Sequence, residues 1–405
     1  MKIAIIGNGI CGIAAAKYIS EDAPKEKIII FTDEKYHYYP RPRLIQLLSE
    51  KTDLGQLFPY NDEWFKNKNI EVILEKGVQR INASSKELIL EDSSKYNYDK
   101  LLLANGSSPF VPPIEGVKSE GVFTLRNVSD VLRIREYSRD KRKAVVIGGG
   151  LLGLETARAL SALGLKVKII EVASRLLPRQ LDEEGAHILK SQVEKIGIEV
   201  IIGTTCGQIY LEGTKKYLIS KEIGKLEADF FIISAGVRPN IEVAKESGII
   251  ANKGVIANKN LRTNFGDIFA AGDCAEFNGI VYGIIPAAIE QGKSAAANII
   301  GKEIEYKGTL FQTTLKVVGI DLTSIGVVNP EGEGYEEVKT KDVAKGIYKK
   351  VVIKDGKVIG TIVMGDKRGI LELTRIIEEK IDVANNKDAL LGNEIALGEA
   401  FFAKS

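Results

Sequence analysis

Short β-branched hydrophobic runs recur along the chain, and two of them begin segments of the same design. Residues 3–12 and residues 145–153 each join such a run directly to a glycine-rich turn. In both places an Ala- and Leu-containing segment follows, and then a second β-branched run. Short apolar runs next to turn residues are typical of buried strands, and longer periodic segments are typical of helices. The pattern predicts two strand–turn–helix–strand units.

The bounds of these elements follow from the same pattern. The two helices are predicted over residues 13–20 and 154–163, and Gly164 is a plausible left-handed cap for the second. The second strands are predicted over residues 27–31 and 166–170. Together these elements give the order of a dinucleotide-binding fold.

The two turns share the spacing GxGxxG. The first glycine permits a tight turn, the second lets the backbone approach a pyrophosphate, and the third lets helix and strand pack closely. The helix N-terminus then faces the phosphate charge. These glycines are Gly7, Gly9 and Gly12 in the first copy and Gly148, Gly150 and Gly153 in the second.

An acidic residue follows the second strand of each unit. The candidates are Asp33 or Glu34 in the first copy and Glu171 in the second. Such a carboxylate accepts hydrogen bonds from the adenosine ribose, so two sites predict two bound dinucleotides. The charge of Glu171 repels a ribose 2′-phosphate and favours NADH over NADPH. Arg175 leaves an alternative open, because it could pair with that phosphate instead of having a surface or capping role.

Composition and charge narrow the class of protein. A chain of 405 residues predicts two or three domains. With 44% apolar and 27% charged residues and a net charge of +2, we expect a soluble globular protein without a general bias toward nucleic acid. Three dispersed cysteines and two histidines predict neither a disulfide framework nor a metal site. No signal peptide or spanning segment is recognised, so we expect a cytoplasmic protein that does not use a membrane.

Three further segments match known motifs in the expected order. They are residues 103–106 (LANG), 235–240 (AGVRPN) and 268–273 (IFAAGD). With the two turns, they resemble the two-dinucleotide flavoproteins of the pyridine nucleotide–disulfide oxidoreductase superfamily. The resemblance implies FAD at the first turn and NADH at the second. It implies further cofactor-binding residues at Ala104, Gly106, Gly236 and Gly272, and at Asp273, which would bind the flavin ribityl chain.

The resemblance also implies an α/β architecture with two Rossmann-like domains and a smaller C-terminal α+β domain. The FAD domain would comprise residues 1–108 and 241–305, the NAD domain residues 109–240, and the C-terminal domain residues 306–405. Within the last domain, the pattern predicts a hairpin of residues 347–353 and 357–364 and an amphipathic helix over residues 371–380.

The absence of cysteine from one segment narrows the subfamily that the chain resembles. Disulfide reductases and single-cysteine relatives carry a thiol after the FAD acid, but residues 37–44 contain none. We expect Cys11 and Cys274 to be packing residues. Residues 38–42 and 314–320 resemble NADH:rubredoxin oxidoreductases and the reductase modules of nitrite reductase.

That resemblance implies hydride transfer from NADH to FAD, and then electron transfer to a small rubredoxin-like or iron–sulfur protein. Glu155 would act near the nicotinamide carboxamide, or would simply place favourable charge in a first helical turn. Arg41 would reach the FAD, or lie at the surface. Val78 would contact adenine through its backbone, or belong to the core.

Three alternatives stay open. The acceptor could be oxygen, as in an NADH oxidase that works without a thiol. The chain could be a flavoprotein scaffold that resembles the apoptosis-inducing factor group. It could also be one subunit of a larger redox complex, in which case residues 396–402 are a docking element or a helix packed on their own domain. The sequence leaves the oligomeric state open.

Overall fold

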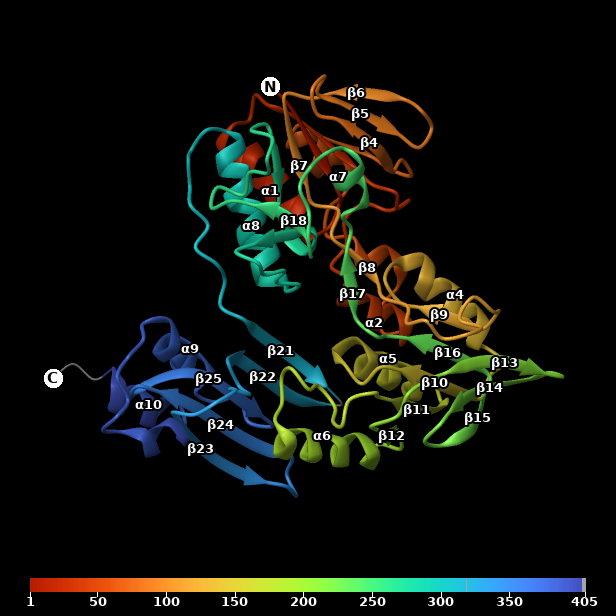
Figure 1. The fold of residues 1–405 in the computed structure, drawn as a ribbon, viewed down its shortest axis with the longest axis vertical. Coiled ribbons are helices and arrows are strands. Elements are labelled where there is room, and N and C mark those ends of the chain that lie inside the picture. The colour runs from red at the N-terminus through yellow and green to blue at the C-terminus, as the bar shows by residue number, and fades with distance from the viewer. Residues whose placement is uncertain (318, 403–405) are drawn as a thin grey trace. The chain divides into compact units, whose positions relative to one another are not determined.

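The computed structural model describes residues 1–317 and 319–402, and its chain divides into two compact units (Figure 1). Unit 1 comprises residues 1–47, 52–108 and 237–309, and unit 2 comprises residues 48–51, 109–236 and 310–405. Val318, within the segment 314–320 used above, lies outside the described residues, as do residues 403–405.

Unit 1 is built on a five-stranded parallel sheet. Its strand order is β19 (Ile268–Ala270), β7 (Lys100–Leu103), β1 (Lys2–Ile6), β2 (Lys27–Phe31) and β3 (Ile70–Ile73). Parallel strands covered on both faces are hydrophobic almost throughout, as β1 and β2 are, with four of five residues buried in each. Helices α1 (Ile10–Asp22) and α8 (Ile285–Ile299) pack against each other in this unit.

Unit 2 contains a second parallel sheet with the same design. Its order is β12 (Glu199–Ile201), β11 (Lys166–Ile170), β10 (Lys143–Ile147), β16 (Phe230–Ile233) and β9 (Val122–Thr124). Helix α5 (Leu151–Ala162) packs on β10 and β11. Helices α4 (Val128–Ser138) and α6 (Glu183–Lys195) pack on β9 and β12. Four strands thus repeat one arrangement, since β16-β10-β11-β12 matches β7-β1-β2-β3, and only the edge strand differs: β19 follows the other four in the chain, whereas β9 precedes them.

Each parallel sheet carries a three-stranded antiparallel insertion, which lies between β3 and β7 in unit 1 and between β12 and β16 in unit 2. The insertions are β4 (Val78–Asn82), β5 (Glu87–Leu90) and β6 (Lys95–Asn97) in unit 1, and β13 (Gln208–Glu212), β14 (Lys215–Ser220) and β15 (Gly224–Ala228) in unit 2. The remaining elements are short: α2 (Arg43–Leu48), η1 (Leu54–Leu57), α3 (Asp62–Asn67), β8 (Ser107–Pro109), β17 (Val237–Pro239), α7 (Glu242–Glu246), β18 (Val255–Ala257), η2 (Gly272–Cys274) and β20 (Ala275–Phe277).

The last part of the chain forms an antiparallel sheet, here called the C-terminal sheet. Its order is β21 (Gln312–Val317), β22 (Ile320–Gly326), β25 (Lys357–Met364), β24 (Ile347–Lys354) and β23 (Tyr335–Asp342). The sheet packs against α9 (Ile370–Glu378) and η3 (Lys387–Leu391), and α10 (Glu394–Phe401) packs on those two. Buried residues such as Val351, Leu373 and Leu397 form the core of this region. The predicted hairpin is confirmed, because β24 and β25 pair through a turn at Asp355 and Gly356.

The predicted strands Lys27–Phe31 and Lys166–Ile170 are confirmed in their bounds. The helix starts predicted at residues 13 and 154 are wrong by three residues, because α1 begins at Ile10 and α5 at Leu151. The cause is that the second glycine of each turn is itself the N-cap, which places the third glycine inside the first helical turn.

Candidate dinucleotide sites

The first glycine turn connects β1 to α1. Gly7 has a φ of +110°, and its N–H donates to the carbonyl of Phe31 at 2.8 Å. A Cβ on Gly7 would overlap the backbone of Ala104, and one on Gly12 would overlap the carbonyl of Gly7. Both positions therefore exclude any side chain. Gly9, by contrast, caps α1 with no heavy atom within 4 Å of where its Cβ would stand. That open space at a helix N-terminus fits a pyrophosphate.

Asn8 gives a second sign that a ligand belongs here. Both polar atoms of its side chain are buried and have no hydrogen-bond partner among the described residues. Buried polar groups are normally satisfied, so an unsatisfied amide in a phosphate-binding turn is an expected contact for a ligand. The residues present therefore fit a bound dinucleotide, and Asn8 is a site residue that the sequence motif did not single out.

The three residues directly after β2 differ in their surroundings. The register places Thr32, directly after Phe31, at the position that Glu171 occupies after Ile170 in the second sheet. Asp33 is exposed. Glu34 is held by an ion pair with Arg41 (2.7 Å) and by the hydroxyl of Tyr39.

The segment before β4 lies beside these residues. The N–H of Lys76 donates to the carbonyl of Thr32 at 2.9 Å, and that of Glu75 donates to the carbonyl of Glu34 at 3.1 Å. Val78, the first residue of β4, follows directly and its side chain is buried in the core of unit 1. The predicted adenosine residues 33–34 and 78 are thus brought together at one edge of the sheet.

The segment after β7 is clamped to the return of the chain at β17. Asn105 and Asn240 exchange amide-to-carbonyl hydrogen bonds of 3.0 and 2.8 Å, and the N–H of Asn240 donates to Gly106 at 2.9 Å. The N–H of Ala104 donates to Ile6 at 2.8 Å and so ties the segment to the strand that carries the first turn. Gly236, at a φ of +98°, belongs to unit 2.

Asp273 lies in η2, three residues after β19 ends. Its carboxylate accepts a hydrogen bond from the Ser107 hydroxyl at 2.9 Å. The N–H of the preceding Gly272 donates to the buried side chain of Gln291 on α8 at 2.8 Å. Gly272 has a φ of +80°, a conformation that favours glycine, so the turn that presents Asp273 depends on it. The sequence analysis did not identify Ser107, which lies 166 residues from Asp273, or Gln291, which lies on another element than the turn it supports.

The second glycine turn connects β10 to α5 and repeats the first. Gly148 has a φ of +120°, and its N–H donates to the carbonyl of Ile170 at 2.7 Å. A Cβ on Gly153 would overlap the carbonyl of Gly148. Gly150 is the N-cap of α5 and, like Gly9, has open space where a Cβ would stand. This turn also fits a phosphate group.

Glu171 directly follows β11 and lies beside the second glycine turn. Its carboxylate accepts hydrogen bonds from the N–H groups of Gly149 at 2.6 Å and Ala173 at 2.7 Å. These use two of the roughly four lone-pair positions of a carboxylate, which leaves capacity for ribose hydroxyls. Arg175 instead donates to the carbonyls of Leu181 (3.3 Å) and Pro178 (3.4 Å). These contacts agree with a surface or capping role for Arg175 and not with pairing to a ribose 2′-phosphate.

Glu155 lies in the first turns of α5 and is partly buried. Burial raises the pKa of its carboxyl, and the nearby Arg158 opposes that rise. Its counterpart in α1 is Ala14, so only the second site carries a carboxylate at this position.

The described residues contain no group of three or more His, Cys, Asp or Glu side chains arranged to hold a metal ion. Cys11 and Cys274 are buried, and burial raises the pKa of both thiols, that of Cys274 to about 11. Within residues 1–317 and 319–402, no helix has the length and apolar character needed to cross a membrane.

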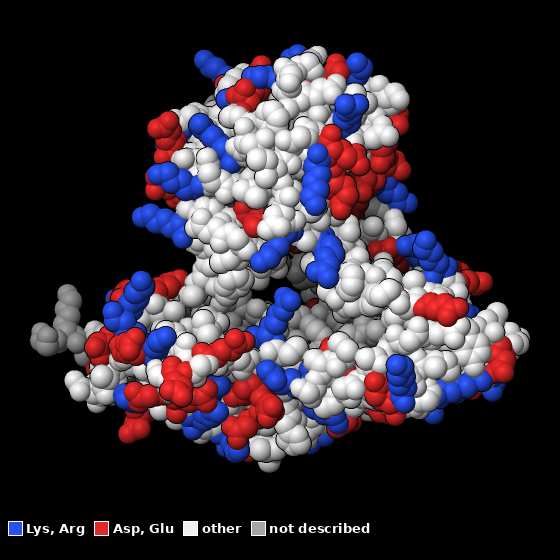
Figure 2. All heavy atoms as spheres, viewed as in Figure 1, with Lys and Arg blue, Asp and Glu red and all other residues white. Residues whose placement is uncertain are grey.

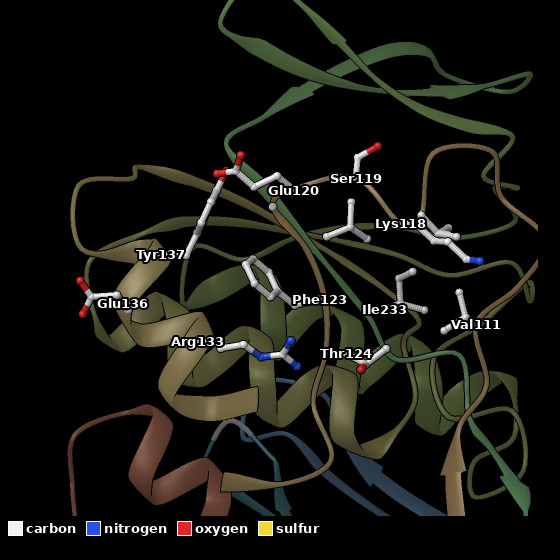
Figure 3. A pocket seen from close by; sticks show the side chains of 13 residues that line it. Val111, Lys118, Ser119, Glu120, Phe123, Thr124, Arg133, Glu136, Tyr137 and Ile233 are labelled. Carbon is white, nitrogen blue, oxygen red and sulfur yellow. The ribbon is translucent and has the colours of Figure 1, made fainter. Parts of the chain in front are cut away.

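An open pocket of about 610 Å³ lies along the edge strand β9 of the second sheet (Figure 3). Phe123 and Thr124 of β9 line it together with Arg133 and Tyr137 of α4, and no residue of the glycine turn takes part. On the face seen in Figure 2, Lys and Arg are interspersed with Asp and Glu.

A family model described as pyridine nucleotide-disulphide oxidoreductase matches residues 1–295. The chain belongs to this family. A second model, the rubredoxin NAD+ reductase C-terminal domain, matches residues 312–381. The cofactors that family membership implies are FAD and NADH, in agreement with the two turns.

Among curated relatives, a nitrite reductase [NAD(P)H] of Bacillus subtilis is 34% identical over 385 residues, which cover 95% of this chain and 48% of that protein. The chain thus spans about half the length of the nitrite and nitrate reductase relatives it matches. An NADH-rubredoxin oxidoreductase of Clostridium acetobutylicum is 30% identical over 396 residues, which cover 97% of this chain and 99% of that protein.

The fold is shared with a solved structure. The crystal structure of NADH:rubredoxin oxidoreductase from Clostridium acetobutylicum has a TM-score of 0.81 and 27% identity, and the match covers 98% of this chain and 99% of that one. The predicted fold class, with two dinucleotide-binding folds and a C-terminal α+β region, is therefore confirmed.

Proposed function

We propose that this chain is an NADH-dependent flavoprotein reductase that delivers electrons to a small rubredoxin-like or iron–sulfur protein. The observation that carries the proposal is the duplication: one chain holds two glycine turns on two parallel sheets that share the order of four strands. The match to NADH-rubredoxin oxidoreductase along 99% of that relative supports it, because no large part of that protein lacks a counterpart here.

The chain's own residues have binding and orienting roles in this proposal. Gly9 and Asn8 would hold the FAD pyrophosphate, and Asp273, oriented by Ser107, would hold the ribityl chain. Gly150 would admit the pyrophosphate of NADH, and Glu171 would bind its adenosine ribose. The chemistry that FAD supplies when bound is acceptance of a hydride from NADH and release of its electrons one at a time.

No thiol step is part of the mechanism. The pKa of each buried cysteine is raised, so the reactive thiolate is scarce at neutral pH. Segment 37–44, where related enzymes carry a cysteine, contains none. Glu155 would orient the nicotinamide carboxamide through a hydrogen bond, a task that a carboxyl of raised pKa performs as acceptor or, once protonated, as donor.

The proposed acceptor follows from the last part of the chain. Residues 312–381 match the rubredoxin NAD+ reductase C-terminal domain, a description that favours a small one-electron carrier protein as partner. Nitrite reductases among the relatives are about twice as long, so the same module in them is followed or preceded by other sequence.

Stopped-flow reoxidation tests this proposal. The protein is reduced with NADH without oxygen and then mixed either with rubredoxin or with aerated buffer. Fast reoxidation by rubredoxin and slow reoxidation by oxygen are expected. Fast reoxidation by oxygen alone would make the protein an NADH oxidase. Slow reaction with both would contradict the proposed carrier-protein activity and favour a subunit or scaffold role.

A further inference from the structure

The segment between Glu171 and α6, here called loop 172–181, is hydrogen-bonded to the second glycine turn. The N–H of Leu177 donates to the carbonyl of Gly149 at 3.3 Å, while Glu171 accepts from Gly149 and from Ala173 in the loop. The loop and the turn therefore meet on both sides of Gly149. A change in the loop changes how Glu171 and the turn are presented to a nucleotide.

The loop conformation is strained at its centre. Leu177 is fully buried and has a φ of +49°, in the left-handed region that non-glycine residues rarely adopt. Such a conformation persists only where surrounding contacts hold it in place. The hydrogen bonds to the backbone carbonyls of Pro178 and Leu181, which follow Leu177 in the loop, are therefore expected to hold Leu177 in this conformation.

Those carbonyls are bound from two sides. Arg175, inside the loop, reaches them at 3.4 and 3.3 Å. Asn329 reaches the same two carbonyls through its Nδ2 at the shorter distances of 3.2 and 3.1 Å. Asn329 belongs to the connection between β22 and β23 of the C-terminal sheet, about 150 residues along the chain from the loop. One amide of the C-terminal sheet thus bridges both carbonyls.

The end of the loop is fixed by the same sheet. Asp182, the N-cap of α6, accepts hydrogen bonds from the N–H of Gly185 at 3.0 Å and from the hydroxyl of Tyr348 at 2.6 Å. Buried Lys350 pairs with the same carboxylate at 3.2 Å. With Asp182 anchored in this way, the side chains that hold the carbonyls of the residues before it are Asn329 and Arg175, and of these only Asn329 comes from the C-terminal sheet region.

We propose that Asn329 is a positioning residue for NADH: through its side-chain amide, the C-terminal sheet holds loop 172–181 in the conformation that presents Glu171 to the adenosine ribose. This inference rests on the proposed NADH site. It gives the C-terminal sheet a task in binding the electron donor, apart from any task in binding the acceptor.

The test uses the oxidised holoprotein and two substitutions, Asn329→Asp and Asn329→Ala. Asn329→Asp keeps the shape but replaces the donor with an acceptor that faces two carbonyls. Titration calorimetry measures the Kd of NAD+, and steady-state kinetics with ferricyanide measures KM and kcat for NADH. We expect both variants to raise the Kd and the KM about tenfold with kcat within about twofold, because the loss is in binding.

Lys341→Ala is the matched control. It removes an ion pair with Glu184 (2.7 Å) that joins the C-terminal sheet to the same helix α6 but lies outside the loop. Its Kd for NAD+ should equal that of the wild type. Hydrogen exchange at the Leu177 amide provides a second readout on the same samples: it should accelerate in the Asn329 variants and not in Lys341→Ala.

The outcomes separate the two proposals. If the wild type binds NAD+ but the Asn329 variants bind it equally well, the positioning role is wrong while the proposed function stands. If Lys341→Ala weakens NAD+ binding as much as the Asn329 variants do, the positioning role of Asn329 is also wrong. The effect would then belong to all the contacts between the C-terminal sheet and the segment 172–195. If the wild type itself does not bind NAD+, the NADH site and the role of Asn329 both fall.

Discussion

The two parallel sheets share the order of four strands, but the residues at the glycine turns after β1 and β10 differ in their hydrogen bonds. In unit 2, Glu171 accepts hydrogen bonds from the N–H groups of Gly149 and Ala173, so the N–H of Gly149 in the turn is satisfied within the protein. In unit 1, the residue at the same register is Thr32, whose hydroxyl accepts a hydrogen bond from the N–H of Glu34 at 3.3 Å. The amide of Asn8 is left buried without a partner among the described residues.

This difference fits two kinds of ligand. A buried unsatisfied polar group costs about 1–3 kcal/mol, and a bound ligand that satisfies it removes that cost. The first site is therefore more stable when filled, which suits a resident cofactor such as FAD. In the second turn the position that matches Asn8 is Gly149, which has no side chain to leave unsatisfied, and this suits a nucleotide that enters and leaves at each turnover, such as NADH.

Substituting the open glycine of each turn gives the strongest test of the comparison. Gly9 and Gly150 have negative φ values and free space at Cβ, so valine there should not strain the protein itself. Gly150→Val should slow flavin reduction by NADH about 100-fold, roughly 2.7 kcal/mol, with the flavin retained. Gly9→Val should lose flavin and keep NAD+ binding. Flavin absorbance and stopped-flow reduction measure both, and a valine variant that retained both ligands would refute the site it alters.

Replacing the residues at the matching register should give an intermediate effect. Glu171→Gln keeps the shape of the carboxylate but removes its charge and one acceptor. We expect the ratio of kcat/KM for NADH to that for NADPH to fall about tenfold, or 1.4 kcal/mol, because the 2′-phosphate is no longer repelled. Thr32→Ala, the matched change in unit 1, should leave that ratio unaltered. A variant that still rejects NADPH as the wild type does would assign the selectivity to another residue.

The sequence predicted the repeated unit well because glycine spacing and β-branched runs are local signals. It placed the strands Lys27–Phe31 and Lys166–Ile170 correctly and the helix starts three residues late. The residue at the Glu171 position in unit 1 was missed, since Asp33 and Glu34 attract attention as acids. Aligning the two repeats strictly from Lys27 and Lys166 would have identified Thr32.

Hydrogen bonds between residues far apart in the chain could not be predicted from the sequence. Ser107 supports Asp273 across 166 residues, and Asn329 reaches Pro178 across 151. Neither contact leaves a periodic or compositional trace, because a single hydrogen bond between loops depends on where the sheets place them. The three-stranded insertion of each unit was also missed, since such short strands resemble turns in an isolated sequence.

Glu155 distinguishes the units by charge, because its counterpart in α1 is Ala14. Glu155→Gln should slow flavin reduction by NADH about two- to tenfold, the value of one hydrogen bond.

The same substitution should have the opposite effect on stability, because it should stabilise the folded protein at neutral pH. Burial raises the folded-state pKa of Glu155, so the wild type loses stability as pH rises from the ordinary carboxyl pKa through the raised one, and the glutamine variant does not. Melting temperatures should therefore favour the variant at pH 7 and converge near pH 4; a gap that is independent of pH would contradict this account.

The smallest effect is expected at the cysteine of the first turn. Cys11 is buried, whereas Leu152, its counterpart after the second glycine of the other turn, is exposed, so the burial of Cys11 itself indicates a packing role rather than a chemical one. Burial raises the pKa of the Cys11 thiol well above its ordinary value, with Cys274 and Asp273 adding to the rise. Because only the thiolate is nucleophilic, iodoacetamide at pH 8 should leave Cys11 unmodified in the folded protein. Cys11→Ala should keep turnover with NADH within about twofold, the limit set by a side chain that takes no part in the chemistry. Rapid alkylation, or a variant whose flavin is reduced by NADH but no longer passes electrons onward, would restore a thiol step to the first unit and make the two turns chemically unlike.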